Sequence, residues 1–152
     1  MVLQFLLGAA LIFLSVIVHV GFIAGAIKVL DIIDQWAMRP PKSLRTATIV
    51  GLAAIWLMLG HAIAIVLWAF AFKGLGVFSD YDTSIYFSAV AFTTLGFGDV
   101  VPPDAWRHLA GICAANGLLL FGVSSAVLVE VLRQVWEVQN VLRRRPPPNN
   151  RL

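Results

Sequence analysis

The sequence is short of charged residues and of cysteine. Only 12% of its 152 residues are Asp, Glu, Lys or Arg, and 60% are hydrophobic. A soluble domain is typically about a quarter charged, so this chain has too little charge to cover a surface that faces water. Its one cysteine, Cys113, cannot form an internal disulfide. These shortages exclude a soluble domain, a disordered chain, a nucleic-acid-binding module and a disulfide-stapled secreted domain, and they indicate an integral membrane protein.

Three long stretches of the sequence are almost free of charge. A helix of about 20 apolar residues crosses the roughly 30 Å hydrocarbon core of a bilayer. Residues 1–27 and 46–72 contain no Asp, Glu, Lys or Arg, and the stretch 106–133 has only Arg107 before Glu130. The sequence therefore predicts three transmembrane helices over these ranges.

Basic residues are distributed unequally between the segments that join these helices. The outer segment that joins the second and third helices, from Lys73 to Arg107, has only these two basic residues. The other nine of the eleven Lys and Arg lie between the first two helices or at and beyond the end of the third. Because cytoplasmic loops carry the excess of Lys and Arg, we expect the N-terminus outside and the C-terminus in the cytoplasm. The expected location is the plasma or inner membrane of the cell.

The segment between the second and third helices contains a shorter apolar stretch. Residues 83–98 are uncharged but too few to cross a bilayer as a helix. Asp82 or Thr83 can cap a helix over 82–93, which would reach about the middle of the membrane at about 1.5 Å per residue. The alternating glycines that follow favour an extended chain over 94–99, which is tolerated at that depth only beside protein or water. This pattern is typical of a re-entrant pore loop.

The stretch Thr93–Asp99 reads TTLGFGD. It resembles the signature sequence of potassium channels, usually T-T-V/I/L-G-Y/F-G-D, and it stands at the same place, between a pore helix and the last transmembrane helix. The resemblance covers roughly residues 47–131, the pore module with two transmembrane helices. It implies the all-α fold of a tetrameric potassium channel, with a pore domain over 46–133 and an additional transmembrane helix over 1–27. That fold has three transmembrane helices, a re-entrant pore helix and an extended selectivity-filter strand.

The residue types in this stretch suit an ion path. Rings of backbone carbonyls can replace the hydration shell of a cation, and Gly96 and Gly98 can adopt the positive φ that such a strand needs. Asp99 would add carboxylates at the outer mouth. One strand cannot surround an ion, and the resemblance implies a homotetramer selective for K⁺. The implied ion-binding residues are Thr94, Leu95, Gly96, Phe97 and Gly98, with K⁺ held at the first four.

The support of the filter departs from the family pattern at two positions. Val90 stands where some members have a Glu that pairs with the filter Asp, and Phe97 has no hydroxyl for aromatic donors at Tyr86 and Phe87 to bond. We therefore expect packing, more than a hydrogen-bonded cuff, to hold the filter, with Leu95 and Phe97 wedged against the pore helix. The residues expected to support the filter are Thr93, Val90 and Phe87.

The third predicted helix contains several residues whose role the sequence leaves open. The resemblance implies a gating hinge at Gly117 or Gly122, and close packing by small residues is the alternative. Asn116 is expected to hydrogen-bond a neighbour rather than to face a water-filled cavity. His61 and His108 are expected to be neutral histidines, although an imidazole can titrate near neutral pH.

The additional helix over 1–27 lacks the spaced arginines of a voltage sensor, and His19 is its only ionisable side chain. We expect it to pack on the lipid-facing side of the pore module. Residues 28–45 are predicted to form a short amphipathic helix at the cytoplasmic interface, with a frayed end of the first helix as the alternative.

An apolar seam runs from the end of the third predicted helix into the cytoplasmic tail, residues 134–152. Its spacing predicts a short four-helix bundle between copies of the chain. The seam comprises Leu128, Val131, Val135, Val138 and Leu142. A basic run then serves either as an anionic-lipid site or only as a topology signal. This run comprises Arg143, Arg144 and Arg145.

The predicted function is passive, potassium-selective conduction. No enzyme is expected, because the scattered histidines, the one cysteine and the adjacent serines make no nucleophile–base or metal constellation. No cofactor and no nucleic-acid partner are expected, and K⁺ would be the permeant ion. The alternatives are a non-selective cation channel or the pore subunit of a cation-transport assembly. An accessory membrane subunit is less favoured, because it does not account for a filter-like strand.

Overall fold

The computed structural model describes residues 2–37 and 42–141. Their helices are α1 (Val2–Ala37), α2 (Lys42–Gly74), α3 (Tyr81–Phe92) and α4 (Arg107–Val141), with a 3₁₀ turn at Asp104–Trp106. No strand occurs within these residues. The predicted all-α fold class is confirmed.

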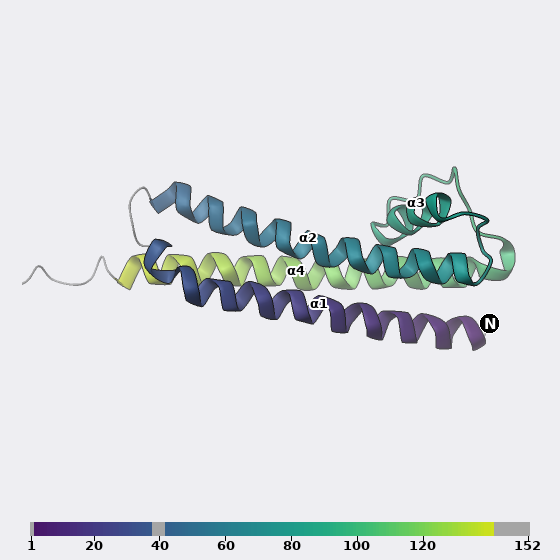
Figure 1. Ribbon diagram of the computed structural model, residues 1–152, viewed down its shortest axis with the longest axis horizontal. Helices are drawn as coiled ribbons and strands as arrows, with labels where there is room; N and C mark the ends of the chain where they lie inside the picture. Colours follow the sequence, from purple (N-terminus) through teal and green to yellow (C-terminus); the bar gives the residue numbers. More distant parts are fainter. Residues whose placement is uncertain (1, 38–41, 142–152) are drawn as a thin grey trace, which may run out of the picture.

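The three long helices lie side by side, and the short helix α3 lies against them at one end (Figure 1). Helix α1 packs on both α2 and α4, and α3 also packs on α2 and α4. The first residues of α1 lie at the same end as α3, which we call the filter end (Figure 1). By length and composition, three segments can cross a membrane: Val2–Lys28, Ser43–Gly74 and Asp104–Glu137.

The helix bounds differ from the predicted ones at the end opposite the filter end. Helix α1 continues through residue 37, since nothing in the sequence before the two prolines at 40 and 41 stops it. The predicted interfacial segment 28–45 is therefore divided between the end of α1 and the start of α2, and residues 38–41 lie outside the described residues. Helix α4 extends eight residues past the predicted end at residue 133.

An aromatic core holds α3 in place at the filter end. The Phe87 ring lies edge-on to Phe72, with centroids 5.2 Å apart, and 4.9 Å from Phe78. Trp68 and Phe92 are fully buried in the same core. Because each large apolar side chain contributes about 1.5–3 kcal/mol when fully buried, this core fixes a helix of only 12 residues.

A second core lies between α2 and α4 at the opposite end. It consists of Ile49, Val131 and Val135, all nearly inaccessible to solvent. Val131 and Val135 belong to the seam that predicted a bundle between copies of the chain. That prediction is wrong for these two residues, because Ile49 of the same chain already covers them. Side chains at 138 and 142 lie outside the described part of the chain.

The second core can be tested with a pair of matched substitutions. Val131→Ala removes buried methyl groups and should lower the free energy of unfolding by about 1–3 kcal/mol. Val129→Ala, whose parent side chain is exposed, should change it far less. Thermal melting in detergent measures both variants, and equal losses would contradict the packing of Val131 against Ile49.

Candidate functional site

Helix α3 is capped by a residue that the sequence analysis did not choose. Asp80 Oδ1 accepts the backbone N–H of Thr83 at 2.7 Å, and Oδ2 accepts the Thr83 hydroxyl at 2.9 Å. The predicted caps were Asp82 or Thr83, and they are wrong because the helix begins one residue earlier, at Tyr81. The bond from the Thr83 amide lowers the pKa of Asp80, so this carboxylate stays charged beside the positive end of the helix dipole.

The far end of α3 is closed by the amides of the residues that follow it. The Thr94 N–H donates to the Ala91 carbonyl at 2.9 Å, and the Leu95 N–H donates to the Val90 carbonyl at 3.0 Å. The Thr93 hydroxyl donates to the Ala89 carbonyl at 2.7 Å. Carbonyls at a helix end need such partners, so the first residues of the predicted filter strand are anchored to the helix itself. Val90 supports the strand through its backbone oxygen.

The backbone after α3 alternates in handedness. Gly96 and Gly98 have φ of 57° and 80°, as the sequence analysis predicted. Thr94 has φ of 59° as well, which places positive φ at every second residue. A threonine in this conformation costs about 1–2 kcal/mol, and such strain is typical of functional sites. The sequence analysis did not predict the positive φ of Thr94, although Thr94 stands two residues before Gly96 and four before Gly98, and this even spacing is a signal.

The two large side chains of this strand do not pack as expected. Leu95 is 58% exposed and Phe97 is 66% exposed in the single chain. The prediction that they wedge the strand against its own pore helix is therefore wrong. The start of the strand is bonded to the end of α3, but no part of this chain covers these two side chains.

A hydrogen bond between side chains holds the other end of the strand. The Tyr86 hydroxyl of α3 donates to Asp99 Oδ2 at 2.5 Å. It lowers the pKa of the Asp99 carboxyl and raises the pKa of the Tyr86 phenol. We expected packing, more than a hydrogen-bonded cuff, to hold the filter, and the structure adds this hydrogen bond, which that expectation did not include. The available signal was a tyrosine in the pore helix facing a filter whose Phe97 has no hydroxyl.

Helix α4 lies behind the end of α3 and touches its backbone. A Cβ atom added at Gly117 would overlap the Phe92 carbonyl group, so no other residue fits there without moving one helix. Among the described residues, an added Cβ at Gly122 would meet nothing within 4 Å. Close packing therefore accounts for Gly117 and not for Gly122. A hinge at either glycine stays a prediction.

Asn116, the neighbour of Gly117, is fully buried. Neither atom of its side-chain amide has a hydrogen-bond partner within the described residues of this chain. The expected hydrogen bond to a neighbour is therefore not made within the single chain. Burying an amide without hydrogen-bond partners costs free energy of folding. A partner from outside the described chain would remove this cost.

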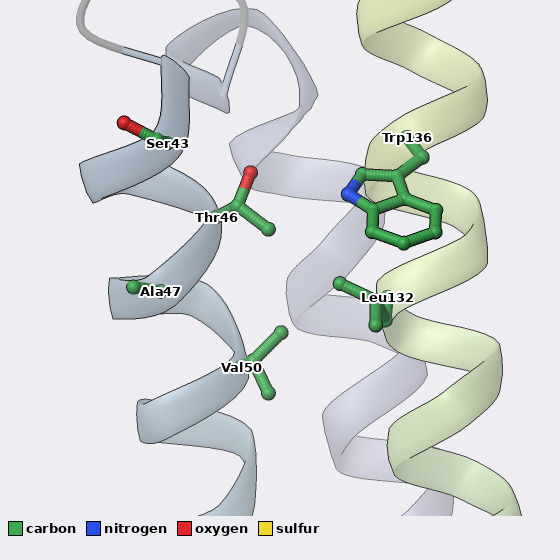
Figure 2. Close-up of a pocket in the computed structure, with 6 residues that line it drawn as sticks. All are labelled: Ser43, Thr46, Ala47, Val50, Leu132 and Trp136. Carbon is green, nitrogen blue, oxygen red and sulfur yellow. The ribbon is translucent and has the colours of Figure 1, made fainter.

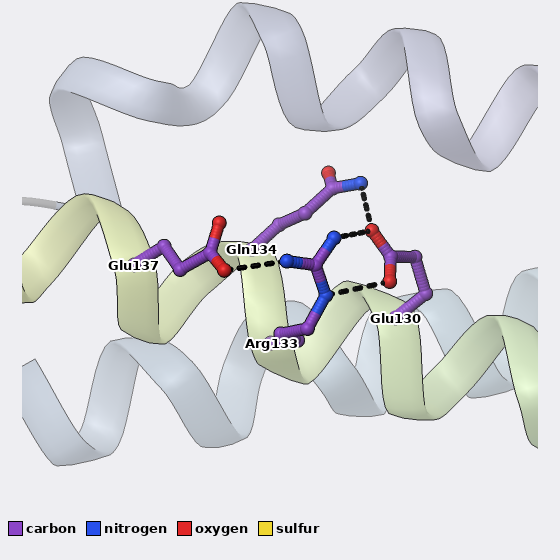
Figure 3. A network of polar contacts seen from close by, with 4 residues as sticks. All are labelled: Glu130, Arg133, Gln134 and Glu137. Carbon is purple, nitrogen blue, oxygen red and sulfur yellow. Dashed lines mark hydrogen bonds and ion pairs between the residues drawn. The ribbon is translucent and has the colours of Figure 1, made fainter.

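Four polar side chains at the opposite end of α4 form a network within that helix (Figure 3). Arg133 Nε donates to Glu130 at 2.8 Å, and its guanidinium also bonds Glu137 at 2.5 Å. Gln134 donates to Glu130 at 2.7 Å. Glu130 is therefore paired with Arg133, and the pair stabilises the helix end.

A groove of about 490 Å³ opens nearby between α2 and α4 (Figure 2). Most of its lining is apolar. The lining residues are Ser43, Thr46, Ala47, Val50, Leu132 and Trp136. The basic run at 143–145, predicted to be an anionic-lipid site or only a topology signal, lies outside the described residues. Within the described residues, no group of three His, Cys, Asp or Glu is placed to hold a metal ion.

The family model described as ion channel matches residues 47–134, more than half of the chain. The chain therefore belongs to the ion channel family and is an integral membrane protein. A relative, "TWiK family of potassium channels protein 18" of Caenorhabditis elegans, is 39% identical over 59 residues. The match covers 37% of this chain and 12% of the relative, so the chain spans only a small part of that relative's length. Both comparisons support the predicted resemblance to the potassium-channel pore module. No solved structure matches the chain.

The bond between Tyr86 and Asp99 predicts a change in carboxyl titration. A carboxyl with a lowered pKa contributes stability that is present at neutral pH and is lost as pH falls through that lowered value. Tyr86→Phe removes the donor and should return the Asp99 pKa toward its ordinary value. Carboxyl ¹³C NMR of the labelled protein measures this shift, with the exposed Tyr81→Phe as control. An unchanged titration of Asp99 in Tyr86→Phe would show that the bond is not formed in solution.

The contact at Gly117 predicts opposite outcomes for two glycine substitutions. Gly117→Ala forces a methyl group into the Phe92 carbonyl and should destabilise the fold by about 1–3 kcal/mol or more. Gly122→Ala has room for the methyl group and should retain the parent melting temperature or exceed it, since alanine favours helix. Size-exclusion chromatography and thermal melting in detergent compare the two. Equal tolerance of both substitutions would contradict the backbone contact.

Proposed function

We propose that four copies of this chain form a potassium-selective pore lined by residues 94–98. The observation that carries this proposal is the alternation of positive φ at Thr94, Gly96 and Gly98 directly after a half-length helix. Such an alternation suits a strand whose successive carbonyls line one axis, where they replace the hydration shell of a cation. In this pore K⁺ moves passively down its gradient, and no cofactor takes part.

The exposure of the strand supports an assembly of several chains. Residues 93–99 are all exposed in the single chain, including two large apolar side chains. A strand anchored at both ends and uncovered in its middle is completed by neighbouring copies around an axis, and closed rotational symmetry is usual for such oligomers. The number four comes from the resemblance to potassium channels.

Electrostatics along the proposed path favour a cation. The carboxyl end of α3 lies where the strand begins, and a helix carries about half a negative charge at that end. Asp99 stands at the other end of the strand with a lowered pKa, so its carboxylates stay ionised at neutral pH. Negative potential at both ends of the strand favours cations over anions.

Selectivity for K⁺ and the orientation in the membrane rest on the sequence. The stretch TTLGFGD matches the potassium-channel signature, and the relative in Caenorhabditis elegans is named a potassium channel. The distribution of Lys and Arg supports an orientation with the filter end outside and the C-terminus in the cytoplasm, in the plasma or inner membrane. A non-selective cation pore would share the fold and lack the selectivity.

Purified protein in liposomes tests this function. Under bi-ionic conditions with K⁺ and Na⁺, the reversal potential should show strong preference for K⁺. Gly96→Ala and Gly98→Ala should abolish selective flux and leave insertion intact, because a Cβ at positive φ costs about 1–2 kcal/mol in every copy. Native mass spectrometry should show a tetramer. Equal permeability to Na⁺ would favour the non-selective channel, and silence of a properly inserted tetramer would favour an accessory subunit.

A further inference from the structure

Three helices each contribute one polar side chain to a buried cluster midway along the bundle. His19 of α1 lies 2.7 Å from the Ser124 hydroxyl of α4, measured from Nε2 to Oγ. His61 of α2 lies 3.0 Å from the same hydroxyl, again through Nε2. Both histidines are 1% exposed and Ser124 is 6% exposed. The serine is therefore the common hydrogen-bond partner of two imidazole rings.

The surroundings of this His19–His61–Ser124 cluster are apolar and aromatic. The two imidazole centroids are 4.6 Å apart, Phe121 stacks on His61 at 4.1 Å, and Phe92 approaches it edge-on at 6.1 Å. No Asp, Glu, Lys or Arg occurs within one helical turn of a cluster residue on α1, α2 or α4, or of Phe92 on α3.

On α4, the ionisable groups nearest to Ser124 in the sequence are remote or occupied. Glu130 is six residues from Ser124, and its carboxylate is bonded to Arg133 and Gln134. Cys113 and His108 lie eleven and sixteen residues before Ser124 on α4. No described side chain therefore stands ready to neutralise a charge on the cluster.

Counting protons shows what the cluster can bind. A serine hydroxyl has one proton, so it donates to one Nε2 and accepts an N–H from the other. The ring that donates to the serine has a bare Nδ1, and neither Nδ1 has a partner within the described residues. A proton arriving at that bare Nδ1 leaves both hydrogen bonds intact. A second proton would have to displace the serine proton from the other ring, beside a ring that is already charged.

We propose that the His19–His61–Ser124 cluster is a binding site for a single proton, which controls how firmly α1 and α2 hold the inner helix α4. In the neutral state two hydrogen bonds fix Ser124 to both neighbours. Uptake of the proton puts an uncompensated charge into an apolar layer, where a charge is strongly disfavoured. The helices then part at Ser124 to admit water.

The consequence for conduction rests on the proposed function. Ser124 lies two residues after Gly122, where an added Cβ would meet nothing within 4 Å among the described residues. Release of Ser124 frees the part of α4 beyond this glycine to bend. Acidification therefore opens the pore and raises K⁺ flux.

Proton binding can be measured without any assay of conduction. The chain has only three histidines, so ¹⁵N-histidine NMR of the full-length protein resolves them, and His108→Gln identifies the His108 signal and leaves those of the two buried rings. From about pH 8 to about pH 4, the two buried rings should take up one proton together. In Ser124→Ala the two rings should lose this shared step. Two independent titrations in the parent protein, or none, would overturn the proposal.

Flux measurements in liposomes test the consequence. With equal pH on both sides, acidification over the same range should raise K⁺ flux about fivefold in the parent protein and in the control His108→Gln. His19→Gln, His61→Gln and Ser124→Ala should lose this response. Retention of the response in these variants, or its absence in a conducting parent protein, would contradict the coupling. A parent protein that shows the shared NMR step and conducts no K⁺ at any pH would refute the channel function and still support the proton site.

Discussion

The position of the filter strand depends on one backbone contact. Helix α3 has to stop inside the structure, and α4 fixes the place where it stops, because Gly117 lets the α4 backbone lie directly on the Phe92 carbonyl. The next residues are tied to the same helix end, since the amides of Thr94 and Leu95 use carbonyls of its last turn. Any side chain at residue 117 would therefore displace α3 and the start of the strand together.

The strand beyond this contact is strained at Thr94, and hydrogen bonds at its two ends hold it in this conformation. A threonine at positive φ persists only where its surroundings leave no alternative. Here the strand is held at its start by α3 and at its end by the bond between Tyr86 and Asp99. Its middle is uncovered in the single chain, and the side-chain amide of the buried Asn116 of α4 has no hydrogen-bond partner within the described residues. The geometry of one chain is thus uncovered along residues 94–98, where we propose that further copies contribute carbonyls to the ion path.

Features set by neighbouring residues could be predicted from the sequence. Runs without charge predicted the three long helices, and alternate glycines predicted positive φ at Gly96 and Gly98. The positive φ of Thr94 was not predicted, because the intrinsic preferences of threonine disfavour that conformation. Only the anchoring of the strand overrides these preferences. The pair of Tyr86 and Asp99 depends on how α3 lies against the strand, which local patterns do not specify.

The spacing of apolar residues along a helix also does not show which other helix they pack against. The spacing of Val131 and Val135 suits packing against another copy of α4 equally well as packing against α2 of the same chain. Burial against Ile49 decided between them. The cluster of His19, His61 and Ser124 joins residues up to 105 positions apart, so no sequence window contains it.

The additional helix α1 shows how polar contacts specify a position in a membrane. Lipid tails are as apolar as leucine, so an uncharged helix gains little from the hydrophobic effect by packing against its neighbours. Polar contacts at three levels instead fix α1: Gln4 to the Ala105 carbonyl, His19 to Ser124, and Trp56 to the Phe22 carbonyl at 2.8 Å. Such bonds contribute about 0.6–2 kcal/mol each, and each joins α1 to a residue of the pore module. Since the middle one ends on α4 itself, a displacement of α4 there has to break or carry along its bond to α1.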